Sequence, residues 1–194
     1  IRQVPMRLPF RFGAVTLTAA AQIHLFADVE TRNGHRAQGV AADMLAPKWF
    51  DKDPSKTYAD NMNDLIDSAQ AACSAVAAVD GPASAFDLWK LGYDAALAWG
   101  ESRGLNELTS AYGSTLLERA IIDGLGRAAG LSYFDMLREN HLGIDLGSLH
   151  DQLTGMSPAD LLPATPRTTM QVRHTVGLLD PLREEATAAS ARIN

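Results

Sequence analysis

The spacing of hydrophobic residues changes once along this chain, and that change limits the folds open to it. Between residues 22 and 30 apolar and polar residues alternate, which is the pattern of a half-buried β-strand. From residue 57 onward apolar residues recur at every third or fourth position, which is the pattern of an amphipathic helix. The sequence therefore predicts an α+β fold, with a sheet at the start of the chain and a helical bundle after it.

The sheet is predicted to be a three-stranded antiparallel meander within residues 8–43. The Asn33-Gly34 pair marks the tip of a hairpin, because both residues tolerate the positive φ angles of a tight turn. A strand over residues 35–42 follows this turn, and an earlier strand is predicted over residues 10–18. Residues 44–56 show no periodicity and are predicted to form a loop.

The bundle is predicted to contain helices over residues 57–79, 84–101 and 107–129, with a short one over 133–139. The first helix has Asp53-Pro54 as its predicted start, since Asp suits the N-cap and Pro the first helical position. The second helix is apolar on several sides and is predicted to be buried nearly all round. One core-facing stripe is predicted on the first helix, formed by Met62, Leu65, Ile66, Ala69, Ala72, Cys73 and Val76.

Three regions of different character divide the chain. Residues 1–140 form the predicted sheet and bundle. Residues 141–169 are punctuated by glycine, proline and serine and are predicted to be a connector with short turns near 146–149 and 158–161. Residues 170–194 begin with a further alternating segment, 170–179, which predicts another strand.

Composition and residue spacing exclude several classes of function. A formal net charge of -6 without a cluster of basic residues argues against nucleic acid as a partner. No apolar run is long enough for a membrane span, and one cysteine, Cys73, cannot form an internal disulfide, so a cytoplasmic protein is expected. The histidines lack zinc-site spacing, and Ser114 lacks the setting of a hydrolase nucleophile.

Three stretches, in order, carry a family resemblance. Residues 120–137, AIIDGLGRAAGLSYFDML, are similar to the pattern A-L-W-D-L-x-G-K-x-x-G-x-P-x-x-x-L-L, with Arg127 at the Lys position and Ser132 at the Pro position. Residues 29–41 are similar to a strand-turn-strand of the form I-E-T-D-D-G-x-x-G-W-G-E-A. Residues 174–181 are similar to a first barrel strand, T-I-G-I-D-S-P. This combination resembles the enolase superfamily, in its mandelate racemase and muconate lactonizing branch.

The resemblance implies an N-terminal capping domain followed by the first strand of a β/α barrel. Complete members abstract the proton α to a carboxylate and hold the enolate on Mg²⁺. In that family the base and the metal ligands lie on later barrel strands, so no catalytic residue and no metal ligand is assigned in this chain. The implied substrate is a small carboxylate, and the implied reaction is that of an isomerase, racemase or dehydratase (a lyase).

By the same resemblance, two loops of the capping domain would close over the barrel mouth. The first maps to residues 10–14 and the second to residues 48–52. Aromatic side chains would supply apolar walls, and cationic ones could pair with an acidic group of the substrate. The expected substrate-binding residues are Arg11, Phe12, Lys48, Trp49 and Phe50.

Structural explanations remain open for the same residues. Arg11 and Lys48 could be solvated loop charges, and the two aromatic residues Trp49 and Phe50 could anchor their loop to the bundle. Asp123 and Arg127 have the spacing of a helix salt bridge, which is the role expected for them.

Two further expectations concern the whole molecule. The chain resembles part of a longer protein, so on its own it is expected to be inactive, and its last strand is expected to need a partner, either the remainder of the barrel or another copy in a homo-oligomer. The alternative functions are a non-catalytic relative that binds a ligand or protein, and a self-standing α+β interaction module.

Overall fold

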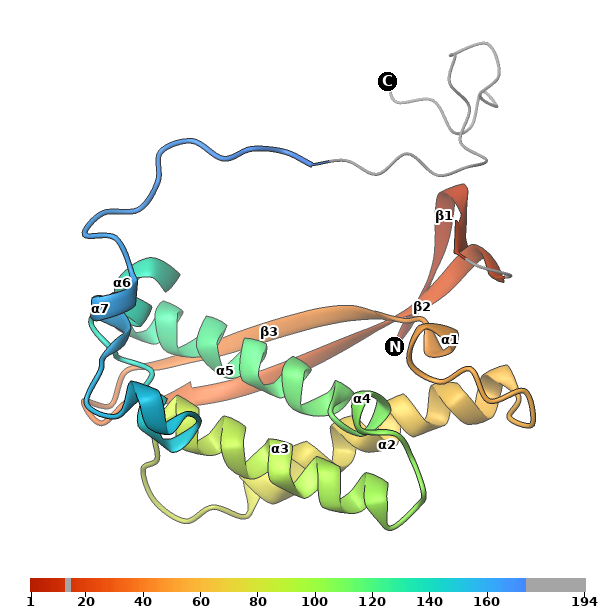
Figure 1. Ribbon diagram of the computed structural model, residues 1–194, viewed down its shortest axis with the longest axis horizontal. Helices are drawn as coiled ribbons and strands as arrows, with labels where there is room; N and C mark the ends of the chain where they lie inside the picture. The colour runs from red at the N-terminus through yellow and green to blue at the C-terminus, as the bar shows by residue number, and fades with distance from the viewer. Residues whose placement is uncertain (13–14, 174–194) are drawn as a thin grey trace.

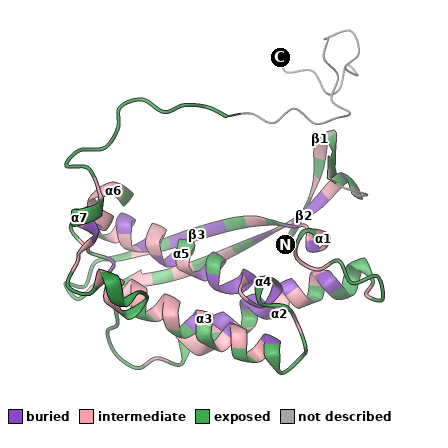
Figure 2. Ribbon diagram, in the orientation of Figure 1, coloured by how far each residue is buried: buried purple, intermediate pink, exposed green. Residues whose placement is uncertain are grey.

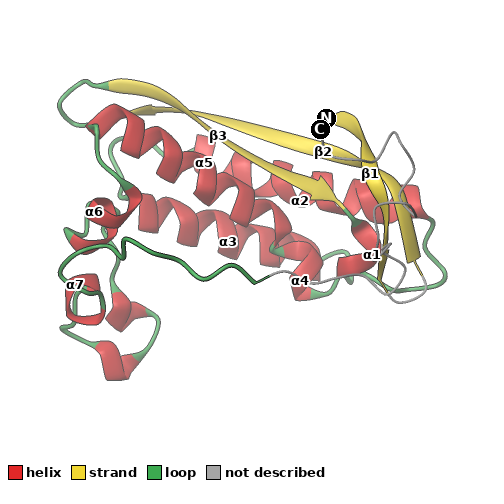
Figure 3. Cartoon of the chain, turned by 90° about the horizontal axis from the view of Figure 1, so that it is seen from above, coloured by secondary structure: helices red, strands yellow, loops and turns green. Residues whose placement is uncertain are grey.

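The protein is an α+β molecule in which a three-stranded antiparallel sheet packs on a bundle of helices (Figures 1 and 3). The computed structural model describes residues 1–12 and 15–173. The predicted fold class and the antiparallel sheet are confirmed. In chain order the elements are β1 (Arg2–Phe12), β2 (Val15–Glu30), β3 (Arg36–Leu45), α1 (Pro47–Phe50), α2 (Tyr58–Ala77), α3 (Ala85–Glu101), α4 (Glu107–Ser110), α5 (Tyr112–Ala129), α6 (Tyr133–Arg138), two 3-10 turns (Leu146–Ser148 and Asp151–Leu153) and α7 (Pro158–Leu161).

The hairpin between β2 and β3 lies where the sequence predicted it. Gly34 has a φ of +79°, and its N–H donates to the carbonyl of Thr31 at 2.9 Å. The register pairs Glu30 with Arg36 across the turn. This register places Leu25, Ala27 and their inner-face neighbours toward the helices, as the alternation predicted.

The prediction of a single strand over residues 10–18 is wrong, because two strands meet within this range. Residues 10–18 span the end of β1 and the beginning of β2, and the chain reverses between Phe12 and Val15. β1 itself begins at Arg2. Alternation could not locate the reversal, because the apolar pattern of one strand runs into that of the next.

The core lies between the inner face of the sheet and helices α2 and α5 (Figure 2). Leu45, Leu65 and Leu116, one each from β3, α2 and α5, are fully buried. The predicted core-facing stripe of α2 is confirmed, since its members are buried or packed against the two core clusters.

α3 lies on the outer side of the bundle, so the prediction that it is buried nearly all round is wrong. Its fully buried positions are small: Gly92, Ala96 and Gly100. Its aromatic residues instead contact one another along its length, with ring centroids 5.4 Å apart for the tilted pair Phe86 and Trp89 and 5.7 Å apart for the stacked pair Trp89 and Tyr93. Such ring contacts give aromatic side chains apolar neighbours without full burial.

Helix α5 and strand β3 touch backbone to backbone. A Cβ on Gly39 would lie 2.0 Å from the carbonyl oxygen of Ala120 and 2.3 Å from the amide nitrogen of Gly124. At this crossing Asp123 accepts a hydrogen bond from the N–H of Val40 at 2.9 Å and pairs with Arg127 at 2.9 Å, which confirms the predicted salt bridge. These contacts cover the outer edge of β3 with groups from the helix.

The predicted helix over 107–129 is divided into α4 and α5 at Ala111. The hydroxyl of Ser68, from α2, bridges this break. It donates to the carbonyl of Ser110 at 2.5 Å and accepts from the N–H of Gly113 at 2.9 Å. A short buried side chain thereby satisfies two backbone groups that a continuous helix would pair internally.

Helix α2 begins at Tyr58, within one residue of the predicted range 57–79, but the prediction that Asp53 is its N-cap is wrong. Thr57 is the N-cap and forms a capping box with Asp60. The carboxylate of Asp53 accepts from the N–H of Ser55 at 2.8 Å, so it stabilises a turn before the helix.

The chain leaves the body of the molecule after α7 and runs out as an exposed segment (Figures 1 and 2). Residues 170–173 form no strand, and Met170 and Val172 are 89% and 94% exposed. The predicted strand is therefore absent over these positions, where no neighbouring strand supplies hydrogen bonds. The rest of the predicted strand, and the stretch 174–181, lie outside the described residues.

Across the described part of the chain, no helix combines the length and hydrophobicity that a bilayer span requires.

Candidate functional site

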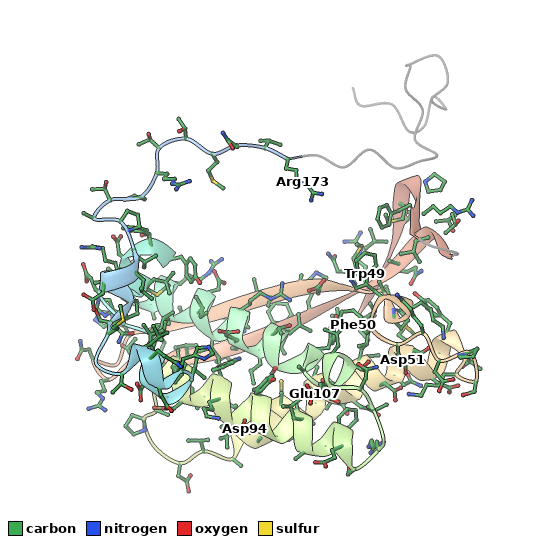
Figure 4. The ribbon with its side chains drawn as sticks, viewed as in Figure 1. Trp49, Phe50, Asp51, Asp94, Glu107 and Arg173 are labelled. Atoms are coloured by element: carbon green, nitrogen blue, oxygen red, sulfur yellow. The ribbon has the colours of Figure 1, made fainter. Side chains whose placement is uncertain are left out.

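The two predicted lid loops lie at the same end of the sheet. β1 and β3 run in the same direction, so Phe12 and Leu45 end their strands toward the same end of the sheet. β2 pairs with β3 only from Ala21 onward, so the β1–β2 hairpin extends beyond β3 by residues 15–20, about 20 Å at the usual rise of a strand. Figure 4 shows Trp49 and Phe50 near the base of this hairpin.

The hairpin places one cationic residue near its tip. Arg11 is exposed and opposes Thr16 in the register. Phe12 ends β1 opposite Val15, and its side chain lies outside the described part of the structure. The remaining predicted positions of this loop, Gly13 and Ala14, are also outside the described residues.

Lys48 is half-buried and holds its own loop. Its ammonium donates to the carbonyl of Asp53 at 3.1 Å and to the carbonyl of Lys56 at 3.2 Å. The lysine therefore closes residues 48–56 into a compact loop. Two backbone carbonyl oxygens therefore already stabilise the positive charge of Lys48.

The two neighbouring aromatic residues point in different directions. Phe50 packs against the first core cluster and meets Tyr112 of α5 edge to face, with ring centroids 5.1 Å apart. Its carbonyl accepts from the side-chain amide of Asn106 at 3.3 Å. Trp49, by contrast, is 57% exposed. Phe50 thus anchors the loop to the bundle, and Trp49 presents an indole at the surface.

A charged cluster fixes the second half of the same loop. The ammonium of Lys56 lies 3.0 Å from Asp51 and 2.9 Å from Asp64 of α2. The side-chain amide of Asn61 donates to the same Asp51 oxygen at 3.2 Å. These ion pairs are mostly shielded from solvent, since the three charged side chains keep 27%, 13% and 21% of their surface exposed. Such a cluster restrains the loop more firmly than exposed pairs would.

The ionisation of the cluster follows from these contacts. Burial opposes charge on Asp51, but the hydrogen bond from the N–H of Asp53 and the ammonium of Lys56 outweigh it and lower the pKa of Asp51. Burial likewise opposes charge on Lys56, and its bonds to Asp64 and Asp51 outweigh it and raise the pKa of Lys56. These contacts thus favour the charged forms of Asp51 and Lys56.

Sequence reasoning missed this cluster, although one signal for its position was available. Thr57 and Asp60 have the spacing of a capping box, which would have placed the start of α2 and ended the loop at the right residue. The pairing of Asp51, Lys56 and Asp64 had no sequence signal, because it depends on how the loop folds back on α2.

The described residues do not assemble a metal site. Across residues 1–12 and 15–173, no three His, Cys, Asp or Glu side chains are grouped so that they could hold a metal ion. This end of the molecule carries the indole of Trp49 and the guanidinium of Arg11, and the loop that holds Trp49 is restrained by its packing and ion pairs.

Comparison of the chain with models of known families, with curated proteins and with solved structures finds no match. The functional argument therefore rests on the sequence resemblance and on the arrangement of these residues.

Proposed function

We propose that this chain is the capping domain of an enolase-superfamily protein of the mandelate racemase and muconate lactonizing type. In this proposal the β1–β2 hairpin and the loop of residues 46–57 cover the mouth of a β/α barrel. The complete protein removes the proton α to the carboxylate of a small substrate, as an isomerase, racemase or lyase. The family assignment rests on the sequence resemblance, and the observation that supports the lid role is that both loops emerge at one end of the sheet.

The second loop has the properties that a lid requires. Phe50 fixes it to the bundle, and the Asp51–Lys56–Asp64 pairs fix its distal part. Trp49 comes directly before these anchors in the chain and is 57% exposed. A rigid support that presents one exposed aromatic residue is how binding sites hold an apolar wall in place without losing entropy when the ligand binds.

The first loop supplies reach and charge. The β1–β2 hairpin extends past the end of β3 and carries Arg11 near its tip. A guanidinium can bind a carboxylate with two hydrogen bonds, which suits the distal end of an acidic substrate. Trp49 and Arg11 would together contact the part of the substrate that does not react and would exclude water from the part that does.

The general base and the Mg²⁺ ligands belong, in this proposal, to the barrel. The described residues do not fit a metal ion, so no step of the reaction is assigned to them. When bound, Mg²⁺ would stabilise the negative charge that develops on the substrate carboxylate.

Proton exchange tests the proposed reaction class. The complete protein, with the barrel on the same chain or on a separate subunit, is incubated in D₂O with a panel of small carboxylates, and loss of the α-proton signal is followed by NMR. We expect exchange at a rate at least about 100-fold above the buffer rate, because a positioned base alone contributes 10²-fold or more, and we expect EDTA to abolish it. Saturable carboxylate binding without exchange would instead support the non-catalytic relative.

A further inference from the structure

Helix α5 runs along β3 (Figure 1), and the guanidinium of Arg119 joins this helix to the last part of the strand. Its Nε donates to the carbonyl of Thr115, in the preceding turn of α5, at 3.1 Å. One terminal nitrogen donates to the carbonyl of Ala42 at 3.4 Å, and the other donates to the carboxylate of Asp43 at 2.8 Å. All three nitrogens are therefore engaged, and the bond to its own helix fixes the direction of the guanidinium.

A continuous series of hydrogen bonds leads from this guanidinium to the backbone of Trp49. The Oδ2 atom of Asp43 accepts from Arg119, and its Oδ1 atom accepts from the N–H of Met44 at 2.8 Å. The carbonyl of Met44 accepts from the N–H of Ala46 at 3.0 Å. The carbonyl of Ala46 then accepts from the N–H of Trp49 at 2.9 Å. Arg119 thereby restrains the turn that carries Trp49, although it belongs to a helix far along the chain.

Helix α5 holds β3 at a second point by the same kind of contact. Arg127 pairs with Asp123 at 2.9 Å, and Asp123 accepts from the N–H of Val40 at 2.9 Å. Each contact thus links an arginine, an aspartate and one N–H of β3. Val40 lies in the middle of the strand, whereas Met44 is its last residue but one. The contact through Arg119 therefore adjoins the loop of residues 46–57, and the contact through Arg127 does not.

Both ion pairs are too exposed to contribute much to stability. The side chains of Arg119 and Asp43 keep 45% and 44% of their surface exposed, and those of Arg127 and Asp123 keep 59% and 33%. Exposed pairs of this kind contribute little to the free energy of unfolding. Loss of Arg119 should therefore shift the loop without unfolding the protein.

We propose that Arg119 is a positioning residue of the lid, which sets the place of Trp49 over the substrate through Asp43 and the turn after β3. The inference rests on the proposed function, since it requires Trp49 to contact the part of the substrate that does not react. Arg119 acts on the backbone of the lid and not on the reacting atoms. Its loss therefore weakens substrate binding and leaves the chemical step unchanged.

Amide hydrogen exchange tests the hydrogen-bond series independently of activity. In the complete protein carrying Arg119→Met, the amides of Met44 and Trp49 should exchange at least about fivefold faster than in the wild type, because the bonds that protect them lose their support. Arg127→Met is the matched control, and these two amides should keep their wild-type rates in it. Unchanged exchange in Arg119→Met, or equally faster exchange in Arg127→Met, would overturn the proposal.

Kinetics test whether this restraint serves the substrate. On the carboxylate that undergoes α-proton exchange, Arg119→Met should raise KM at least about threefold and leave kcat within about twofold, as expected when binding common to the ground and transition states is lost. Arg127→Met should change neither constant. Asp43→Ala should raise KM at least as much as Arg119→Met, and the double variant should not exceed Asp43→Ala, because the two residues act in series.

The outcomes separate this proposal from the proposed function. Faster amide exchange with an unchanged KM would overturn the positioning role of Arg119, and so would multiplied effects in the double variant. A wild-type protein that exchanges no α-proton of any carboxylate would instead refute the proposed function. The exchange rate of the Trp49 amide would still decide whether Arg119 restrains the turn.

Discussion

Gly39→Ala is expected to destabilise the protein by at least about 3 kcal/mol, because overpacking against backbone cannot relax by a rotamer change. The new Cβ would lie 2.0 Å from the carbonyl oxygen of Ala120 and 2.7 Å from the Cα of Gly124. β3 or α5 would have to move, and the movement would also break the hydrogen bond between Asp123 and Val40. Urea denaturation followed by circular dichroism measures the loss.

The matched control for this variant is Ala42→Val. Ala42 lies on the same strand but is exposed on the open face, so a larger side chain meets no backbone there. Its effect should stay within about 0.5 kcal/mol, the usual range for surface substitutions. If Gly39→Ala were as stable as the wild type, the close crossing of β3 and α5 would be disproved.

Ser68→Ala is the other substitution with a large expected effect, a loss of about 2–4 kcal/mol of stability. The hydroxyl is fully buried and serves both the carbonyl of Ser110 and the N–H of Gly113. Without it, two buried backbone groups are left unpaired, and each costs about 1–3 kcal/mol. Alanine has nearly the same volume as serine, so the measured loss reports hydrogen bonding and not a cavity.

Ser74→Ala on the same helix is the comparison. Ser74 is exposed, and its replacement by the better helix former should leave stability unchanged or slightly raised. Hydrogen exchange adds a local readout, since the amide of Gly113 should lose protection in Ser68→Ala. An unchanged amide at Gly113 would show that the bridge across the α4–α5 break is not formed.

Local patterns predicted the parts of the fold that depend on local chemistry. The Asn33-Gly34 turn depends on two adjacent residues. The alternation along β2 and the stripe on α2 each depend on one element that is buried on one face. The pairing of Asp123 with Arg127 was also predictable, because it lies within one helix turn.

Parts that depend on packing between distant segments were missed. The limits of β1 follow from its pairing with β2, and the partial exposure of α3 follows from its place outside α2 and α5. The role of Gly39 depends on Gly124, far along the chain. Hydrophobic periodicity reports which face of an element is apolar but not which element covers that face.

In the candidate site, too, some features follow from the local sequence and others depend on contacts between distant segments. The sequence placed Lys48, Trp49 and Phe50 in one loop, but their directions come from tertiary contacts. Phe50 packs inward because Tyr112 lies beneath it, and Lys48 turns back to the carbonyls of its own loop. Only Trp49 of these three is left mostly exposed.

The lid role is tested most directly by kcat/KM of the complete protein carrying Trp49→Ala, measured on the carboxylate that undergoes exchange. We expect a fall of at least about tenfold, which corresponds to about 1.4 kcal/mol of lost transition-state stabilisation, at unchanged stability. Phe26→Ala is the control, because Phe26 is a similarly exposed aromatic residue (60%, against 57% for Trp49) on the open face of the sheet. It should change kcat/KM less than twofold. A folded Trp49→Ala protein with wild-type kcat/KM would contradict the proposal that this loop covers the substrate.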